Sequence, residues 1–321
     1  MGQAKRPGEF ELIARYFRPL AAGRTGALGL TDDAALIDVP QGRQLVVTAD
    51  LLTAGVHFLP DDPPDLIARK ALRVNLSDLA ATAAKPLAYF LTCAFPEDIQ
   101  EAWIAGFCAG LARDQAEFDI ALMGGDTTAT PGPLTLSITA LGTVVPGREL
   151  RRSGARAGDL VAVSGTIGDA TLGLARLRGR IGPVAGEDYL VERYRLPQPR
   201  LALAQSLAGL ATAGMDVSDG LVADLGHICE VCGLGAVIES ARVPVSDPAR
   251  TVLATGSTPL IDLFTGGDDY ELLVTVPAGR EGELTGWPVT VIGRMEQGSG
   301  LRVLDPAGRE LPVARAGFRH F

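Results

Sequence analysis

The sequence is poor in the residues that several common chemistries require. Its 321 residues include only three histidines and four cysteines, and aromatic side chains make up 5% of the chain. The cysteines, Cys93, Cys108, Cys229 and Cys232, are too few to form a disulfide framework in a chain of this length. We therefore expect a protein of a reducing compartment and place it in the cytoplasm.

Long apolar runs and an excess of positive charge are also missing. No stretch of about 18 apolar residues is present to cross a bilayer, and the opening MGQAKRPGEFELIARYF lacks the apolar segment of a secretory signal. The formal net charge is −9, whereas proteins that bind nucleic acid along the whole chain are normally basic. We expect neither a membrane nor a nucleic acid as a partner.

Three familiar site motifs are absent as well. The chain has no G-x-x-x-x-G-K-[ST] phosphate-binding loop, and neither the H-R-D loop nor the V-A-I-K strand of protein kinases. Cys229 and Cys232 lie in a helical pattern with His227 nearby, but a zinc site needs more ligands than these supply. Two buried helical cysteines are the simpler interpretation.

Strand-like and helix-like segments alternate through the chain, which predicts an α/β (α+β) fold in two domains. Helices are expected over residues 9–17, 63–84, 98–117, 169–179 and 199–214, and after the turn that ends at residue 220. Strands are expected over residues 43–50, 132–145, 159–165, 235–239, 270–276 and 288–293. The Gly- and Arg-rich loop PGRELRRSGARAGD separates a domain of residues 1–150 from a domain of residues 151–321.

Aspartates recur beside these elements. Asp50, Asp126, Asp216 and Asp268 each follow a strand-like segment, and most of them have glycine neighbours. Loops at strand ends are fixed by the scaffold yet exposed, and glycine lets a ligand approach the backbone closely. We expect these positions to carry function.

A further aspartate lies in the helix predicted over residues 63–84. Ala71, Asn75, Asp78 and Thr82 have the spacing of one helix face. The face is small and polar, whereas solvent-facing stripes usually carry Lys, Glu and Arg. We interpret it as a buried polar site, with a solvent-facing stripe as the alternative.

The chemistry of clustered carboxylates points to metal and phosphate. Carboxylates in one cleft stay ionised together only when cations lie between them, and oxygen ligands favour Mg²⁺, Ca²⁺ or Mn²⁺. No EF-hand pattern is present, and Mg²⁺ held by a few carboxylates usually shares its shell with phosphates. The residues indicate a Mg-nucleotide enzyme. The alternative is a set of surface aspartates with turn and capping roles, such as Asp219 capping the helix that begins at Gly220.

Taken together, the motifs resemble the thiamine-monophosphate kinase family of the AIR-synthetase-like ATP-binding superfamily. The resemblance runs the length of the chain and depends on the set and its order, since each piece alone is weak. The motifs are GEFELIARYF, DDAAL, TADLLTAGVHF, KALRVNLSDLAA, GGDTT, RRSGARAGD, VSGTIGDATLGL, MDVSDGLVADLGHI, GGDDYELLVTV and GFRHF.

The resemblance implies transfer of the γ-phosphate of ATP to thiamine monophosphate, the last step in making thiamine diphosphate. It implies a two-domain AIR-synthetase-like fold. The sheet of the first domain pairs with that of a second subunit in a homodimer, and the second domain covers the nucleotide cleft. It also implies ATP as the co-substrate and several Mg²⁺ ions.

Carried over motif by motif, the resemblance implies three sets of site residues. The implied Mg²⁺ ligands are Asp33, Thr48, Asp50, Asp78, Asp126, Asp216 and Asp219. The implied ATP contacts are Gly125, Asp126, Arg152 and Ser218. The implied contacts to thiamine phosphate are His57, Asp268 and Phe318. Asp268 then faces the cationic thiazolium ring. The family assigns no role to its neighbour Asp269, for which we expect a turn or structural role, and alternation along an extended segment would point the two side chains apart.

Two positions depart from the family's pattern. Thr31 stands where the family usually has glycine before the paired aspartates, and Ala49 stands where it usually has a second hydroxyl residue. A side-chain metal contact at Ala49 is therefore excluded. No general base is expected, because a phosphate monoester with a second pKa of about 6 is already largely ionised at neutral pH.

Related enzymes fit the sequence less well. Selenophosphate synthetase needs a reactive Cys or selenocysteine near the N-terminus, and residues 1–92 hold no Cys. The hydrogenase-maturation dehydratase carries a C-terminal Cys tail, and AIR synthetase lacks this combination of NLSDLAA and GGDDYEL. A catalytically silent binding protein is expected to have lost some of the aspartates.

Overall fold

The computed structural model describes residues 7–318, which form two compact units. The first consists of residues up to Leu79 together with Lys85–Pro146. The second consists of Ala80–Ala84 together with the chain from Gly147 onward. Each helix among the described residues is too short or too polar to span a lipid bilayer.

The first unit is built on a four-stranded sheet with the order β1-β4-β2-β3. Its strands are β1 (Gln44–Thr53), β2 (Lys85–Pro96), β3 (Ala121–Thr130) and β4 (Thr135–Val144). Strands β2 and β3 are parallel, and the other neighbours are antiparallel. Strand β2 was not predicted, although its residues alternate between buried positions such as Tyr89, Leu91 and Cys93 and more exposed ones.

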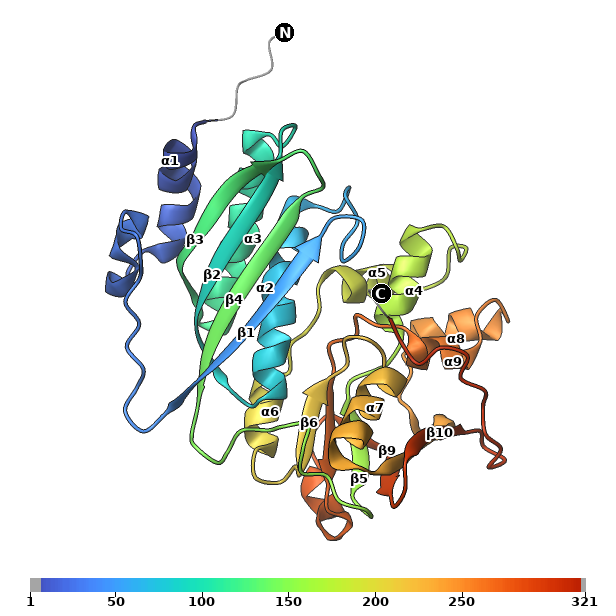
Figure 1. Ribbon diagram of the computed structural model, residues 1–321. Coiled ribbons are helices and arrows are strands. Elements are labelled where there is room, and N and C mark those ends of the chain that lie inside the picture. The colour runs from blue at the N-terminus through green and yellow to red at the C-terminus, as the bar shows by residue number, and fades with distance from the viewer. Residues whose placement is uncertain (1–6, 319–321) are drawn as a thin grey trace. The chain divides into compact units, whose positions relative to one another are not determined.

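Two long helices, α2 (Pro64–Ala81) and α3 (Glu101–Phe118), lie behind this sheet in the view of Figure 1. The residues of the strands alternate between the face covered by these helices and the opposite face. On β4, Leu136, Ile138 and Ala140 are fully buried, as the period-2 pattern predicts. The opposite face carries exposed apolar side chains, including Val47 and Leu51 of β1.

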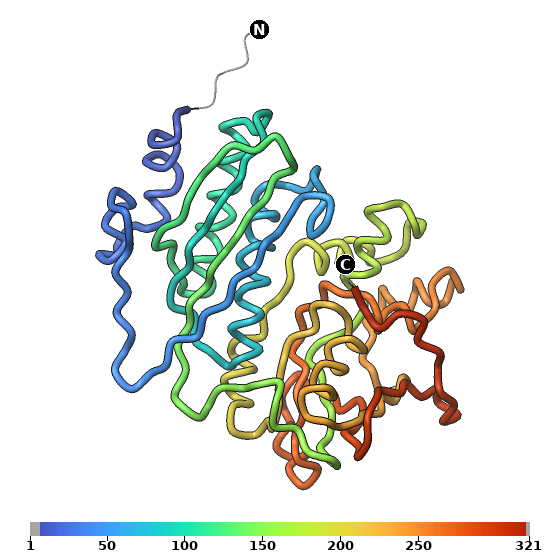
Figure 2. Tube along the Cα trace, in the orientation of Figure 1, coloured from blue at the N-terminus to red at the C-terminus, as the bar shows by residue number. Residues whose placement is uncertain are grey.

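The chain before β1 is irregular. It forms α1 (Glu9–Leu12), η1 (Ile13–Phe17), η2 (Arg18–Ala21) and η3 (Thr25–Leu30), so the helix predicted over residues 9–17 is one turn of α-helix continued by a π-helical segment. A long extended stretch then leads to β1, as the dark blue tube in Figure 2 shows. Ala27, Ala35 and Ile37 pack against Met123 of β3.

The second unit has a six-stranded sheet with the order β10-β7-β9-β5-β8-β6. The strands are β5 (Leu160–Ser164), β6 (Ala213–Asp216), β7 (Gly235–Glu239), β8 (Leu272–Val276), β9 (Val289–Glu296) and β10 (Gly300–Leu304). The helical segments are α4 (Asp169–Leu177), α5 (Glu187–Arg195), α6 (Leu201–Leu207), α7 (Leu221–Cys232), η4 (Ser240–Arg242), α8 (Asp247–Ala254), α9 (Leu260–Thr265) and η5 (Ala278–Leu284).

Two apolar layers sandwich this second sheet. One contains Val161 and Leu273 with residues of α4, α7, α8 and α9. The other contains Ala162 and Val274 with residues of α6 and with Ala80 and Ala83. Alternate residues of β5 and β8 therefore enter different layers, as expected for a sheet covered on both faces.

One predicted helix is wrong in extent. The helix predicted over residues 199–214 ends at Leu207, and residues 213–216 form β6, which pairs with β8. Pairing with the edge of the sheet overrides the helical propensity of the alanines and leucines in this stretch. Strand β10 and helices α5, α8 and α9 were not predicted.

Candidate functional site

In the first unit, three of the predicted metal ligands come together where β1 faces α2. Thr48 and Asp50 lie on the same pleat of β1, and Thr48 Oγ1 donates a hydrogen bond of 2.5 Å to Asp78 Oδ2 on α2. Burial, followed by the charge of Asp78, raises the pKa of Asp50 to about 7. Asn75, one turn before Asp78, is fully buried, so the polar helix face is a buried site at this point, as predicted.

Asp126 lies elsewhere on the same sheet. It is within β3, where it pairs with Thr92 of β2. Thr92 pairs with Ser137 of β4, and Ser137 pairs with Leu51 of β1, so these four residues form one row across the sheet. Asp50 belongs to the neighbouring row, which contains Ile138 and Leu91. Three strand spacings separate β1 from β3, roughly 14 Å.

Neighbouring rows of a sheet point to opposite faces, so Asp50 and Asp126 of one chain do not share one ion. The expectation that both residues end a strand is also wrong. Each lies inside one, because β1 and β3 continue beyond them to Thr53 and Thr130.

The glycine before Asp126 is required by packing. A Cβ on Gly125 would lie 1.8 Å from the carbonyl oxygen of Leu91 on β2. Asp126 itself is exposed, and its carboxylate accepts a hydrogen bond from the Thr127 amide at 2.8 Å. The backbone of β3 is thus held close to β2 while the Asp126 side chain stays accessible to a ligand.

Asp33 and His57 lie in two loops of the first unit. Asp33 is exposed in the segment after η3, whose residues Ala35 and Ile37 pack near β3. His57 follows β1, and its Nδ1 accepts a hydrogen bond of 3.0 Å from the Thr53 amide. That bond holds the imidazole to the turn that closes β1 and fixes the orientation of the ring.

In the second unit, three segments meet in a backbone junction. We call the segments Asp216–Gly220, Gly266–Tyr270 and Gly317–Phe318 the aspartate junction. The amide of Asp268 donates to the Ser218 carbonyl at 2.8 Å, and the amide of Phe318 donates to the Asp219 carbonyl at 3.0 Å. The junction therefore brings together residues that were predicted separately as metal, ATP and substrate contacts.

The glycines of the junction permit this close approach. A Cβ on Gly267 would lie 2.3 Å from the Ser218 carbonyl oxygen, and one on Gly317 would lie 2.5 Å from that of Asp219. Phe318 keeps 44% of its surface exposed. The ring is thus available to a ligand while its backbone is fixed.

Asp268 and Asp269 have different environments. Asp268 is half-buried, whereas Asp269 is fully buried and its carboxylate accepts from the Gly168 amide at 2.8 Å, next to the start of α4. This burial agrees with a turn or structural role for Asp269. The expected alternation along an extended segment is wrong, because Asp268 has a φ of 69° and the segment is not extended. Asp268 also follows helix α9 and not a strand.

Left-handed backbone recurs two residues later, at Tyr270 with a φ of 50°. Such a conformation costs a non-glycine residue roughly 1–2 kcal/mol, and it persists only where the surroundings enforce it. The loop is therefore held in a conformation that its own residues disfavour.

Asp219 does not cap helix α7. The amides of Asp219 and Gly220, just before the helix, each donate to the Oδ2 atom of Asp224 at 3.1 Å, one turn into the helix. Burial, followed by the charges of Asp216 and Asp219, raises the pKa of Asp224 well above its ordinary value. Asp219, Asp224 and His227 each offer a ligand atom within 4.8 Å of the others.

Asp224 was therefore missed as a candidate site residue, although it lies in the motif MDVSDGLVADLGHI. The signal was its position three residues before His227, on the same helix face. Asp216, which ends β6 as predicted, adds a third carboxylate beside this group.

Arg152 is less closely associated with the junction. Its carbonyl accepts from Cys232 Sγ at the end of α7, and the preceding Arg151 carbonyl accepts from the Gly214 amide in β6. The Arg152 side chain is exposed. Cys229 is buried as predicted, whereas Cys232 is partly exposed.

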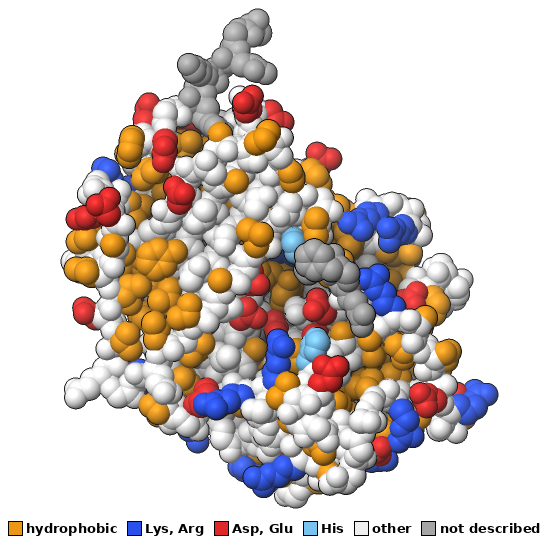
Figure 3. All heavy atoms as spheres, in the orientation of Figure 1, with side chains coloured by type: hydrophobic (Ala, Val, Ile, Leu, Met, Phe, Trp, Pro, Cys, Tyr) orange, Lys and Arg blue, Asp and Glu red, His pale blue; other side chains and the backbone are white. Residues whose placement is uncertain are grey.

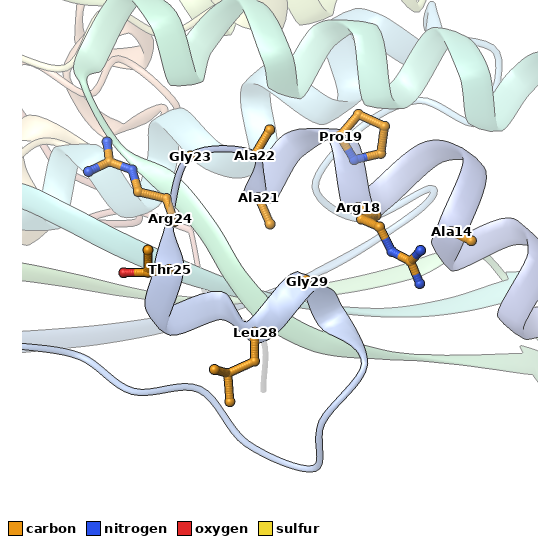
Figure 4. A pocket seen from close by; sticks show the side chains of 10 residues that line it. All are labelled: Ala14, Arg18, Pro19, Ala21, Ala22, Gly23, Arg24, Thr25, Leu28 and Gly29. Carbon is orange, nitrogen blue, oxygen red and sulfur yellow. The ribbon is translucent and has the colours of Figure 1, made fainter.

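A separate hollow of about 650 Å³ lies in the N-terminal segment of the first unit. Figure 4 shows Arg18, Arg24 and Leu28 around it, with small residues between them. None of the residues that line it belongs to the predicted site.

Comparison with known proteins identifies both domains of the chain. The family described as AIR synthase related protein, N-terminal domain, matches residues 31–144, and its C-terminal domain matches residues 156–305. The thiamine-monophosphate kinase of Caulobacter vibrioides is 41% identical over 326 residues, covering 99% of this chain and 92% of that protein.

Two solved structures are similar over most of their length. The crystal structure of thiamine-monophosphate kinase from Stenotrophomonas maltophilia K279a superimposes with a TM-score of 0.83 and 41% identity, over 92% of this chain and 96% of that one. AaThiL complexed with AMPPCP and TMP superimposes with a TM-score of 0.80 and 32% identity, over 100% and 99%. The chain therefore belongs to the thiamine-monophosphate kinase family of AIR synthase related proteins.

Proposed function

We propose that this protein transfers the γ-phosphate of ATP to thiamine monophosphate and releases thiamine diphosphate. The observation that carries the proposal is the aspartate junction, where Ser218, Asp219, Asp268 and Phe318 meet. A relative of the same fold, AaThiL, is complexed with AMPPCP and TMP, which supports a nucleotide and a thiamine phosphate as the two ligands.

The residues available suit a reaction without a general base. The attacking oxygen belongs to a phosphate monoester with a second pKa of about 6, so it is largely ionised at neutral pH. The difficulty is the repulsion between this anion and the γ-phosphate. Positioning and charge neutralisation are then the main tasks of the protein, and we propose direct in-line transfer.

The proposed substrate contacts are His57, Asp268 and Phe318. A carboxylate at Asp268 attracts the cationic thiazolium ring, and the exposed Phe318 ring offers an apolar surface. The proposed ATP contacts are Gly125, Asp126, Arg152 and Ser218. Arg152, whose side chain is exposed, suits phosphate oxygens through its planar guanidinium group.

We propose Mg²⁺ as the metal, held by Asp33, Thr48, Asp50, Asp78 and Asp126 in the first unit and by Asp216 and Asp219 in the second. The donors fit, because they are carboxylate and hydroxyl oxygens, and because Asp50 and Asp224 have raised pKa values beside other carboxylates. Bound Mg²⁺ supplies the positive charge that offsets the phosphates. The distance between β1 and β3 supports more than one ion.

We also propose a homodimer in the cytoplasm, with residues 1–150 carrying metal binding and subunit pairing and residues 151–321 forming the second domain. The exposed row of Leu45, Val47 and Leu51 on β1 supports pairing of the sheets. Figure 3 shows hydrophobic side chains on the face of the first unit that is turned to the viewer. A second subunit also offers a way for Asp50 and Asp126 to serve one site.

The activity is tested by incubating the protein with ATP, Mg²⁺ and thiamine monophosphate and measuring thiamine diphosphate. We expect product with the native protein and none with folded Asp126→Asn. Failure of the folded native protein to form product contradicts the proposal, and a phosphorylated enzyme formed with ATP alone contradicts direct transfer.

A site that takes Asp50 from one subunit and Asp126 from the other is tested by refolding Asp50→Asn and Asp126→Asn subunits together. If each site takes one residue from each subunit, mixed dimers contain one intact site and recover part of the activity. An inactive mixture with proven subunit exchange contradicts sharing between subunits.

A further inference from the structure

A network of buried charges surrounds the loop that carries Asp268. Asp268 and Tyr270 both have left-handed backbone, and Asp269 between them is fully buried. Non-glycine residues stay in this conformation only where neighbouring groups hold them. The network of charges provides those groups.

Arg193 on α5 is the residue that joins the loop to β8. Its Nη2 atom donates to the backbone carbonyl of Asp269 at 3.0 Å and to Glu271 Oε1 at 2.8 Å. The Arg193 side chain is 7% exposed and that of Glu271 is 1% exposed. One buried nitrogen therefore links the peptide that follows Asp269 to Glu271, the residue that precedes β8.

Two other residues donate hydrogen bonds to the Glu271 carboxylate. Arg200 Nε donates to Glu271 Oε2 at 2.7 Å, and Ser164 Oγ donates to the same oxygen. A Cβ on Gly165 would lie 2.2 Å from Glu271 Oε1, so the glycine leaves the space that the carboxylate occupies. Glu271 is thus a rigid anchor for Arg193.

The placement of the Arg193 side chain lowers the stability of the fold in one respect. Its Nε atom is buried and has no hydrogen-bond partner among the residues that the structure describes. A buried donor without a partner lowers stability. A residue retained at such a cost is typical of a place where function sets the geometry.

We propose that Arg193 is a positioning residue for thiamine monophosphate, acting through the Asp269 carbonyl on the orientation of Asp268. The inference rests on the proposed function, in which Asp268 faces the thiazolium ring. It assigns Arg193 to binding of the thiamine substrate and not to binding of ATP or to phosphoryl transfer.

The test compares the native protein with Arg193→Gln. Glu271 keeps Arg200 and Ser164 in this variant, so the buried carboxylate remains paired. We expect the KM for thiamine monophosphate to rise about tenfold, while the KM for ATP changes less than twofold and kcat less than threefold. The matched control is Arg176→Gln, which removes an ion pair with Glu187 between α4 and α5 and leaves the loop that carries Asp268 unchanged. Its kcat and both of its KM values should stay within twofold of those of the native protein.

A second comparison separates positioning from general damage. In an Asp268→Ala background, adding Arg193→Gln should raise the KM for thiamine monophosphate no further, because the residue it positions is gone. If Arg193→Gln does not fold, Arg193→Lys, which keeps the positive charge, should show the same split with a smaller rise.

Three results overturn the inference. They are an unchanged KM for thiamine monophosphate in the folded variant, an equal rise in both KM values, and an additive effect in the Asp268→Ala background. Absence of thiamine diphosphate from the native protein overturns the proposed function instead, so the two failures are distinguishable.

Discussion

Replacing Asp50 by Asn is expected to stabilise the metal-free protein. The Asp50 carboxyl has its pKa raised from 3.8 to about 7, first by burial and then by Asp78. The folded state therefore holds this proton more tightly than the unfolded state. Stability is lost as the pH rises from about 4 to about 7, and the full penalty applies above pH 7.

The magnitude follows from the size of the shift. Each pKa unit corresponds to about 1.4 kcal/mol, so the difference between 3.8 and about 7 corresponds to about 4 kcal/mol. Asp50 is only half-buried, and solvent screens part of the interaction. We therefore expect Asp50→Asn to raise the free energy of unfolding by ~2 kcal/mol at pH 8 and to change it little near pH 4.

The assay is urea unfolding followed by circular dichroism across this pH range, in EDTA and again with Mg²⁺. Mg²⁺ should stabilise the native protein and have a smaller effect on Asp50→Asn, because a carboxylate ligand is gone. The control is Asp38→Asn, at an exposed aspartate of the first unit. The reasoning is refuted if Asp50→Asn is less stable than native at pH 8, or if the difference does not depend on pH.

Two further substitutions test the packing around the site. Gly125→Ala places a Cβ 1.8 Å from the Leu91 carbonyl oxygen, so β2 and β3 must separate. We expect the free energy of unfolding, measured in urea, to fall by about 2–3 kcal/mol. The control is Gly132→Ala, whose Cβ would meet nothing closer than 3.4 Å and which should change stability little. Near pH 4, where its raised pKa keeps the Asp224 carboxyl neutral, Asp224→Ala removes the acceptor for the amides of Asp219 and Gly220 just before α7 and should cost about 1 kcal/mol. At the same pH Asp224→Asn keeps an acceptor oxygen and should cost less. Equal losses for Asp224→Ala and Asp224→Asn contradict the capping role.

Local patterns predicted the two-unit α/β architecture and several elements well. The alternation on β4 and the long α2 are both visible in short windows of the sequence. The wrong extent of α6 has a nonlocal cause, because β6 exists only by pairing with β8, some sixty residues later in the chain. No window around residues 199–214 contains that partner.

In the candidate site, too, local patterns predicted some features and nonlocal contacts decided the others. Asp78 was identified from helix spacing, and its contact with Thr48 agrees with that prediction. Asp50 and Asp126 were both predicted to end a strand, yet the strand register places them on different rows and three strand spacings apart. Asp224 was missed because its importance depends on the folding of the Asp219–Gly220 amides back onto it.

The assignment of Ala80–Ala84 to the second unit affects how the protein can be made. Ala80 and Ala83 belong to the same apolar layer as Leu203 and Leu207, which are synthesised more than a hundred residues later. During translation, the end of α2 therefore emerges well before its packing partners. A fragment starting at residue 151 would lack part of its own core and would need a peptide containing residues 80–84 to complete it.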